Sequence, residues 1–317
     1  MTGAMRALLA WPCPPQLLAP LVRMDVTVVP YAGDPSEDAL KAAIAGQHAL
    51  ICTPWTPVTR DVVAAADVLR VVSTVAVGYD NIDVTALRER GIRVGHTPGV
   101  VVEATADLTY GLILAVMRRI IAGDRFVRRG EWPGGIDALG HDLRAKTLGI
   151  IGLGAIGSAV ARRASASGMR IAYANRRPKP DAPAEAVFLP LDDLLAKADC
   201  VCVLAPLSEA TRGMIDARAL AKMKCGSFLV NAARGGLVDT GALYDALASG
   251  HLAGAAADVM EPEPIGAEHP LLTLPNFFIT PHIGTATFET RSAMGELCIA
   301  NAVAGLRGEP LPAEVPA

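Results

Sequence analysis

The chain has 317 residues, of which 51% are hydrophobic and 19% are charged, and its formal net charge is −3. This composition is typical of a well-buried globular enzyme and excludes a disordered or fibrous chain, and the length is sufficient for two domains with separate cores. The slightly acidic balance disfavours nucleic-acid binding, and no apolar run reaches the ~18–20 residues that cross a bilayer, so neither nucleic acid nor a membrane is an expected partner.

The N-terminal segment carries one charge followed by an apolar stretch, but prolines interrupt it, which disfavours a signal peptide. "RALLAW" and "DVTVVPY" instead predict two short strands flanking a helix. The six cysteines show neither metal-ligand nor disulfide spacing, so no metal site is expected. Cys200 and Cys202 alternate along one apolar strand and are predicted to be buried packing thiols, which suits a cytoplasmic protein.

Farther along the chain, short apolar runs alternate with helical patterns, which predicts an α/β fold with parallel sheets. The predicted strands cover residues 49–53, 70–77, 147–153, 170–174, 199–205, 227–232, 254–259 and 277–280. Residues 103–121 predict one long helix with few charges in its middle, expected to be buried between domains or between subunits. The Pro-rich tail "GEPLPAEVPA" is expected to be an exposed end.

A glycine-rich turn lies in "TLGIIGLGAIGSAVARRASASGMRIAYA", where Gly152, Gly154 and Gly157 form G-x-G-x-x-G between an apolar strand and a helix. The first glycine allows a tight turn, the second lets the backbone approach a pyrophosphate, and the third lets helix and strand pack closely. Free N–H groups at the helix start then hold phosphate oxygens. Alone the motif is weak evidence, but within a strand–turn–helix–strand unit it predicts dinucleotide binding rather than a purely structural turn.

The second strand of this unit ends in "NRRP". In an NAD-binding unit an acid at this position accepts hydrogen bonds from the adenosine ribose, but here Asn175 takes its place, followed by Arg176 and Arg177. No carboxylate would repel a 2′-phosphate, and the two guanidinium groups can neutralise one. A solvated basic turn is the alternative. The pattern favours NADP, with NADPH preferred over NADH.

Three polar residues each follow a predicted strand: Arg234 in "FLVNAARGG", Glu263 in "AAADVMEPEP" and His282 in "FFITPHIGTAT". Ligands of doubly wound sheets bind outside the carboxyl ends of the strands, so these side chains could converge on one crevice. Each residue alone is ambiguous. Together they suit reduction of a 2-keto acid, with a guanidinium to grip the carboxylate or keto oxygen, a histidine to protonate that oxygen, and a carboxylate to orient the imidazole.

Several stretches resemble the D-2-hydroxyacid dehydrogenase family over nearly the full chain: "VGYDNIDV", "TPGVVVEATAD", "GIIGLGAIG", "NAARGGLVD", "DVMEPEP", "HPLLTLPNFFITPHIGTAT" and "ANAVAGLRGEP". Within the family the chain looks most like the glyoxylate/hydroxypyruvate reductases, whose usual NADPH preference fits the basic turn. The resemblance implies that Arg234 binds the substrate's carboxylate and keto group, that His282 is the acid/base and that Glu263 is its partner. The backbone N–H groups of Val77 and Gly78 would bind the substrate carboxylate.

The resemblance also implies two Rossmann-like, doubly wound α/β domains, with the cofactor domain inserted into a discontinuous substrate domain. Crossings near residues 98 and 285 would make 99–285 the dinucleotide-binding domain, and 1–98 with 286–317 a flavodoxin-like substrate domain. The helix over residues 103–121 would belong to a homodimer interface. Further positions that match the cofactor lining of such enzymes are Thr105, Ala155, Ile156, Asp258 and Gly284.

The leading interpretation is NADPH-dependent reduction of a glyoxylate- or hydroxypyruvate-type 2-keto acid to the D-2-hydroxy acid. Another substrate preference stays open, because the segment before the glycine turn contains one tryptophan, Trp132, whereas some glyoxylate reductases carry several there. Formate dehydrogenases pair the histidine with glutamine, which Glu263 disfavours. A phosphoglycerate dehydrogenase is disfavoured because many of those append a regulatory domain. A dinucleotide-sensing corepressor is an alternative, since such proteins share the fold and the three polar residues, but it is disfavoured because they carry long tails for partner motifs.

Overall fold

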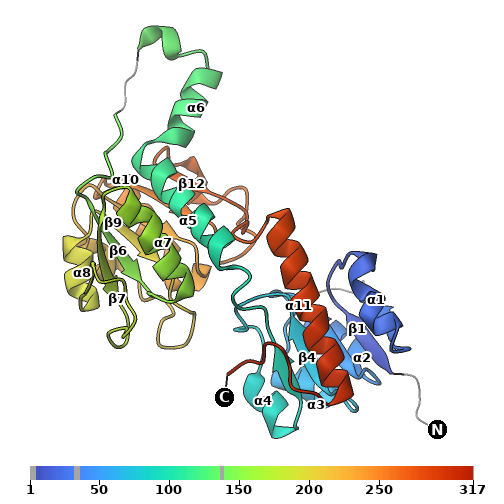
Figure 1. Ribbon diagram of the computed structural model, residues 1–317. Helices are drawn as coiled ribbons and strands as arrows, with labels where there is room; N and C mark the ends of the chain where they lie inside the picture. Colours follow the sequence, from blue (N-terminus) through green and yellow to red (C-terminus); the bar gives the residue numbers. More distant parts are fainter. Residues whose placement is uncertain (1–4, 32–35, 136–138, 317) are drawn as a thin grey trace. The chain divides into compact units, whose positions relative to one another are not determined.

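The computed structural model describes residues 5–31, 36–135 and 139–316 (Figure 1). The chain divides into two compact units, residues 1–101 with 286–317 (unit 1) and residues 102–285 (unit 2). Unit 2 is therefore inserted into the sequence of unit 1, between residues 101 and 286.

Unit 1 is built on a parallel sheet of order β2-β1-β3-β4-β5, the flavodoxin order. Its strands are β1 (Arg6–Leu9), β2 (Thr27–Pro30), β3 (Ala49–Cys52), β4 (Val71–Thr74) and β5 (Arg93–Gly95). Its helices are α1 (Ala19–Val22), α2 (Glu37–Ile44), α3 (Arg60–Ala65), α4 (Val84–Glu89) and α11 (Phe288–Arg307), with a 3-10 turn η1 (Pro15–Leu18) before α1. The two predicted N-terminal strands and the helix between them are confirmed.

Short polar side chains set where four of these helices begin. Ser36, Thr59, Asp83 and Thr287 precede α2, α3, α4 and α11, and each accepts a hydrogen bond from the backbone N–H three residues later. These bonds satisfy N–H groups that have no partner within the helix. The sheet between them is apolar on both faces, with α2, α3 and α4 packed on one core and α1 and α11 on the other.

The C-terminal tail packs against the rest of unit 1, so the prediction of an exposed end holds for most of its described residues and is wrong for two of them. Leu311 and Val315 are buried. Asn301 of α11 accepts a hydrogen bond from the N–H of Ala313, and Glu314 forms an isolated bridge with the edge strand β5 at Gly95. The tail thus covers apolar surface and an otherwise unpaired strand edge, which the prolines in its sequence do not reveal.

Unit 2 is built on a parallel sheet of order β12-β11-β10-β9-β6-β7-β8, which is the Rossmann order extended by one strand. Its strands are β6 (Thr147–Ile151), β7 (Arg170–Ala174), β8 (Ala186–Phe188), β9 (Cys200–Val203), β10 (Ser227–Asn231), β11 (Leu252–Ala257) and β12 (Phe277–Ile279). Its helices are α5 (Val102–Met117), α6 (Ile120–Arg128), α7 (Ala155–Ala166), α8 (Leu191–Lys197), α9 (Ala217–Lys222) and α10 (Thr240–Ala248). Short 3-10 turns are η2 (Trp132–Gly134), η3 (Gly235–Leu237) and η4 (Pro270–Thr273).

Helices cover both faces of the unit 2 sheet, with α5 and α7 side by side on one face (Figure 1). Residues of β6 and β9 alternate between two apolar cores, so Cys200 and Cys202 face α5 and α7 while Val201 and Val203 face the α8–α10 side. Both thiols are fully buried, as predicted. The predicted fold class, two doubly wound α/β domains with one inserted into the other, is confirmed.

The prediction of a single helix over residues 103–121 is wrong at its C-terminal end. Helix α5 ends at Met117, and α6 begins at Ile120 after Arg119 adopts left-handed backbone angles, with φ of 55°. One such residue stops the helical hydrogen-bond pattern and turns the chain. None of the helices in the described residues is both long enough and apolar enough to span a bilayer.

Candidate active site

Three neighbouring parallel strands of unit 2 end at one edge, and the three predicted catalytic residues follow them. Arg234 comes after β10, Glu263 after β11 and His282 after β12. Asn231 shapes the turn that leads to Arg234, because its Nδ2 donates to the Arg234 carbonyl at 2.9 Å and its Oδ1 accepts from the N–H of Ala233. The guanidinium donates through Nη1 to the carbonyl of Ala233 at 2.8 Å.

Glu263 and His282 are in direct contact. The imidazole Nδ1 lies 2.6 Å from Glu263 Oε1, and both side chains are about three-quarters buried, with 26% and 27% of their surface exposed. The other carboxylate oxygen accepts from the N–H of Met260 at 3.4 Å. Because a carboxylate only accepts, Nδ1 carries the proton in this bond, and Nε2 is the ring nitrogen at which the imidazole could act as an acid or a base.

Asp258 holds the turn on which His282 sits. Its carboxylate is almost fully buried and accepts from the N–H groups of Ile283 at 2.9 Å and Gly284 at 2.8 Å, and from Thr280 Oγ1 at 2.6 Å. The N–H of His282 donates to the Asp258 carbonyl at 2.9 Å. These bonds hold His282 at a φ of 53°, in the left-handed region that a residue with a Cβ rarely adopts.

The three glycines of the turn after β6 have distinct surroundings. Gly152 has φ of 98°, and a Cβ there would lie 2.6 Å from the Ala205 nitrogen, while a Cβ on Gly157 would lie 2.5 Å from the Gly152 carbonyl oxygen. Both glycines are therefore required by packing. Around Gly154 a Cβ would meet no described protein atom within 4 Å. Its missing side chain leaves room for a ligand, which is the role assigned to the second glycine of a dinucleotide-binding turn.

Helix α7 begins directly after Gly154, and no side chain caps its first turn. The N–H groups of Ala155, Ile156 and Gly157 therefore lie at an uncapped helix start, where the helix dipole is positive. Ala155 is exposed, Ile156 is half-buried and Gly157 is buried. The residues present thus fit the pyrophosphate of a dinucleotide.

At the end of β7, Asn175 Oδ1 accepts from the N–H of Leu153 at 2.8 Å, which ties the strand end to the glycine turn. Arg176 and Arg177 follow and are exposed. Within the described part of the chain neither arginine has an ion-pair partner. The predicted basic turn therefore lies beside the glycine turn, with two guanidinium groups that no described carboxylate neutralises.

Thr105, Asp258 and Gly284 lie close together. A Cβ on Gly284 would be 3.2 Å from Asp258 Oδ2 and 3.4 Å from Thr105 Cγ2. Val77 and Gly78 belong to unit 1 and follow β4 at the carboxyl edge of that sheet. Sequence reasoning missed Thr280 and Asn231, although both stand beside predicted strand ends in "FFITPH" and "FLVNAA", where polar residues are a usable signal.

Comparisons with known proteins place the chain in a family. Residues 110–284 match the family model of the NAD-binding domain of D-isomer-specific 2-hydroxyacid dehydrogenases. The chain is 44% identical over 280 residues to a glyoxylate reductase of Korarchaeum cryptofilum, covering 87% of this chain and 84% of that one.

Among the solved structures that are similar over almost the whole chain are two reductases. One is a glyoxylate reductase from Paecilomyes thermophila, with a TM-score of 0.91, 36% identity and 99% of each chain covered. The other is an NADPH-dependent glyoxylate/hydroxypyruvate reductase from Sinorhizobium meliloti in complex with NADP and malonate, with a TM-score of 0.90, 32% identity, and 99% of this chain and 97% of that one covered. The resemblance read from the motifs is confirmed: the chain belongs to the D-isomer-specific 2-hydroxyacid dehydrogenase family.

Proposed function

We propose that this protein reduces a small 2-keto acid of the glyoxylate or hydroxypyruvate type to the D-2-hydroxy acid, with NADPH as the preferred cofactor. The observation that carries the proposal is the 2.6 Å contact between His282 Nδ1 and Glu263 Oε1 at the strand edge that also bears Arg234. Relatives named glyoxylate reductase support the substrate class, and the complex of one structural neighbour with NADP supports the cofactor.

In this proposal unit 2 holds the cofactor, and unit 1 contributes the loop of Val77 and Gly78 to substrate binding. When bound, a reduced nicotinamide supplies the hydride that reaches the keto carbon. Arg234 grips the substrate's carboxylate and keto oxygen, and His282 gives a proton from Nε2 to that oxygen as negative charge develops there. Glu263 then faces an imidazole that has lost a proton and can regain it from solvent.

Turnover of a panel of 2-keto acids, each with NADPH and with NADH, tests the activity. Glyoxylate, hydroxypyruvate, pyruvate and phenylpyruvate cover a small, a polar, a methyl and an aromatic side chain. We expect the highest kcat/KM for glyoxylate or hydroxypyruvate with NADPH. A preference for phenylpyruvate would keep the reaction type but replace the substrate class, and binding of NADPH without turnover of any acid would contradict the proposed reaction.

The basic turn tests the cofactor preference separately. Arg176→Ala and Arg177→Ala, singly and together, remove the groups proposed to hold the 2′-phosphate. Loss of a hydrogen bond to a charged group costs about 1.5–3 kcal/mol, so KM for NADPH should rise roughly ten- to a hundred-fold. KM for NADH should barely move, because NADH lacks that phosphate.

Asn175→Asp on the double variant should then favour NADH. One aspartate oxygen can keep the bond to the N–H of Leu153 that Asn175 Oδ1 makes, while the other accepts from a ribose hydroxyl. Arg162→Ala is the control, because Arg162 is an exposed arginine on α7 that pairs with Glu103. A double-alanine variant that kept its NADPH preference would show that the basic turn is a solvated surface.

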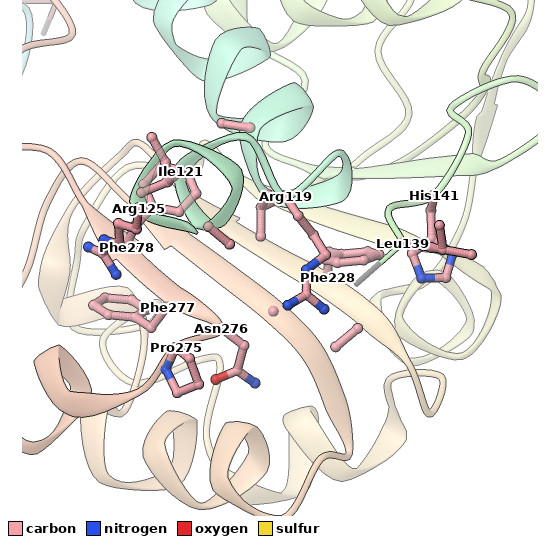
Figure 2. Close-up of a pocket in the computed structure, with 15 residues that line it drawn as sticks. Arg119, Ile121, Arg125, Leu139, His141, Phe228, Pro275, Asn276, Phe277 and Phe278 are labelled. Carbon is pink, nitrogen blue, oxygen red and sulfur yellow. The ribbon is translucent and has the colours of Figure 1, made fainter. Parts of the chain in front are cut away.

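We further propose that the protein is a homodimer, with α6 in the interface. Every residue of α6 is exposed or half-buried, and Ile120 and Val127 expose 53% and 48% of their surface. Beside α6, a hollow is lined by Arg119 and Arg125 on the helix side and by Phe228 and other residues at the amino ends of the strands (Figure 2). Apolar side chains on an uncovered helix, next to a hollow lined by aromatic rings, are typical of an interface.

A further inference from the structure

The imidazole of His96 is buried beneath the loop that follows β4. Its ring Nδ1 lies 3.0 Å from the carbonyl oxygen of Val77, and only 8% of the residue is exposed. The Tyr79 ring packs edge-on against it, with ring centroids 5.6 Å apart and an interplanar angle of 83°. Because a carbonyl only accepts, Nδ1 carries the proton in this bond.

This bond lies where the backbone pairing of the sheet ends. After β4 the chain stays paired for two residues, since the N–H of Val75 donates to the Cys52 carbonyl and the Ala76 carbonyl accepts from the N–H of Thr97. At Val77 the carbonyl is bonded instead by the His96 side chain. Within the described residues no acceptor bonds the N–H of Val77 or of Gly78.

Because of the geometry of the peptide unit, the bond between His96 and the Val77 carbonyl also affects the Gly78 N–H. The Val77 carbonyl and the Gly78 N–H belong to one trans peptide, which is planar, so they point in opposite directions. Fixing the carbonyl against His96 therefore fixes the direction of the Gly78 N–H on the other side of the peptide. Rotation of the peptide would cost the His96 bond and leave a buried imidazole donor unpaired.

The backbone around His96 is itself held firmly. Its N–H donates to the Ala313 carbonyl at 3.0 Å, and its carbonyl accepts from Asn301 Nδ2 at 2.9 Å. The far end of the loop is tied as well, because Asn81 Nδ2 donates to the carbonyls of Thr53 and Thr56. The imidazole is thus a rigid support rather than a loose surface group.

We propose that His96 is a positioning residue, which aims the Gly78 N–H at the carboxylate of the 2-keto acid and so determines how tightly acids bind. The inference rests on the proposed function, in which Val77 and Gly78 bind that carboxylate. It adds a residue that touches neither substrate nor cofactor and that acts through the Val77–Gly78 peptide alone.

The test compares three variants that differ in the donor. His96→Phe keeps a ring for Tyr79 but has no donor, and His96→Leu removes both ring and donor. His96→Asn places an amide N–H near the position of Nδ1. His251→Phe is the matched control, because its ring Nε2 likewise lies 3.0 Å from a backbone carbonyl, that of Leu220, in unit 2.

In His96→Phe and His96→Leu we expect KM for glyoxylate to rise roughly tenfold, which is the lower end of the range for losing a hydrogen bond to a charged group. We expect kcat to change by less than about threefold, because the lost contact is to the substrate carboxylate and not to the reacting atoms. The dissociation constant of NADPH should stay within about twofold, since unit 2 is untouched. His96→Asn should restore most of the affinity, and His251→Phe should behave like the parent. Thermal unfolding of each variant checks that the fold is intact.

Calorimetric titration of the NADPH-loaded protein with oxamate, a non-reducible analogue of a 2-keto acid, separates this inference from the proposed reaction. Weaker oxamate binding in His96→Phe supports the role of His96 even if the parent turns over no 2-keto acid. Unchanged oxamate affinity in His96→Phe overturns the inference. A folded His96→Asn that binds as poorly as His96→Phe also overturns it, because the donor would then not be the cause. If the parent binds no oxamate, both proposals fail.

Discussion

His282 has the backbone angles of a left-handed residue, and this affects how its role can be tested. At a φ of 53°, an alanine would still have a Cβ and would bear the conformational cost of the left-handed region, roughly 1–2 kcal/mol, whereas asparagine tolerates this region. His282→Asn therefore removes the proton donor while retaining the turn on Asp258. We expect kcat to fall roughly 10²- to 10⁴-fold with little change in NADPH affinity, measured by steady-state kinetics and fluorescence titration. Near-normal turnover would remove His282 from the proposed chemistry.

The cysteines are expected to differ in reactivity, because burial disfavours the thiolate. Burial raises the pKa of Cys13 to about 11 and those of Cys200 and Cys298 to about 12, and it also raises the pKa of Cys52 and Cys202. Cys225 is exposed.

At pH 8 a thiol of pKa 11 is ionised to roughly one part in a thousand, so Cys225 alone should react rapidly with DTNB in the folded protein. All six thiols should react after unfolding in guanidinium. Cys225→Ser is the control and should abolish the fast phase. Rapid reaction of a second thiol in that variant would contradict the raised pKa of the other five thiols.

At the scale of the elements, Asp199 joins three segments of the unit 2 sheet. It precedes β9, accepts from the N–H of Thr147 at the start of β6 at 2.7 Å, and pairs with Lys224 before β10 at 3.0 Å. Burial opposes ionisation of this carboxyl, but the Thr147 N–H and Lys224 outweigh it, so the pKa of Asp199 is lowered. A lowered folded-state pKa stabilises the fold above the unfolded-state value of about 3.9, and this stability is lost as the pH falls through the folded-state pKa.

Asp199→Asn should therefore lower the free energy of unfolding by about 1 kcal/mol at pH 7, since the bonds to a charged acceptor become bonds to a neutral one. The difference from the parent should shrink as the pH falls below about 4. Urea unfolding at several pH values measures both. Asp192→Asn is the control, because Asp192 also pairs with a lysine, Lys222, but is mostly exposed and should contribute little. A pH-independent loss in Asp199→Asn would mean that its charge is not involved.

At the scale of the whole molecule, the proposed dimer makes the apolar side of α6 an interface. Val127→Glu should convert the dimer into a monomer at micromolar concentration, because an unpaired carboxylate would be buried between the subunits. Sedimentation velocity measures the change. Val187→Glu is the matched control, since Val187 is similarly exposed, at 57%, but lies in β8 at the opposite edge of the sheet. A monomeric parent, or a dimer that persists in Val127→Glu, would contradict the proposed interface.

Features that depend on local spacing can be read from the amino-acid sequence. The strands around the glycine turn, the three glycines and the polar residue after each of β10, β11 and β12 are all readable, because alternating burial and special turn positions restrict the residues at each step. The alternation of strands and helices also predicted an α/β fold with parallel sheets, whereas the two doubly wound domains and the insertion of one into the other followed from the family resemblance.

Which of these residues come into contact depends on how the strands are arranged in the folded chain. Nineteen positions separate Glu263 from His282 and Val77 from His96, and the pairings arise because adjacent parallel strands bring their carboxyl ends together. The role of Asp258 in holding the His282 turn and the burial of Leu311 and Val315 in the C-terminal tail have the same origin. Each depends on contacts between segments distant in sequence, and local periodicity carries no record of which segments those are.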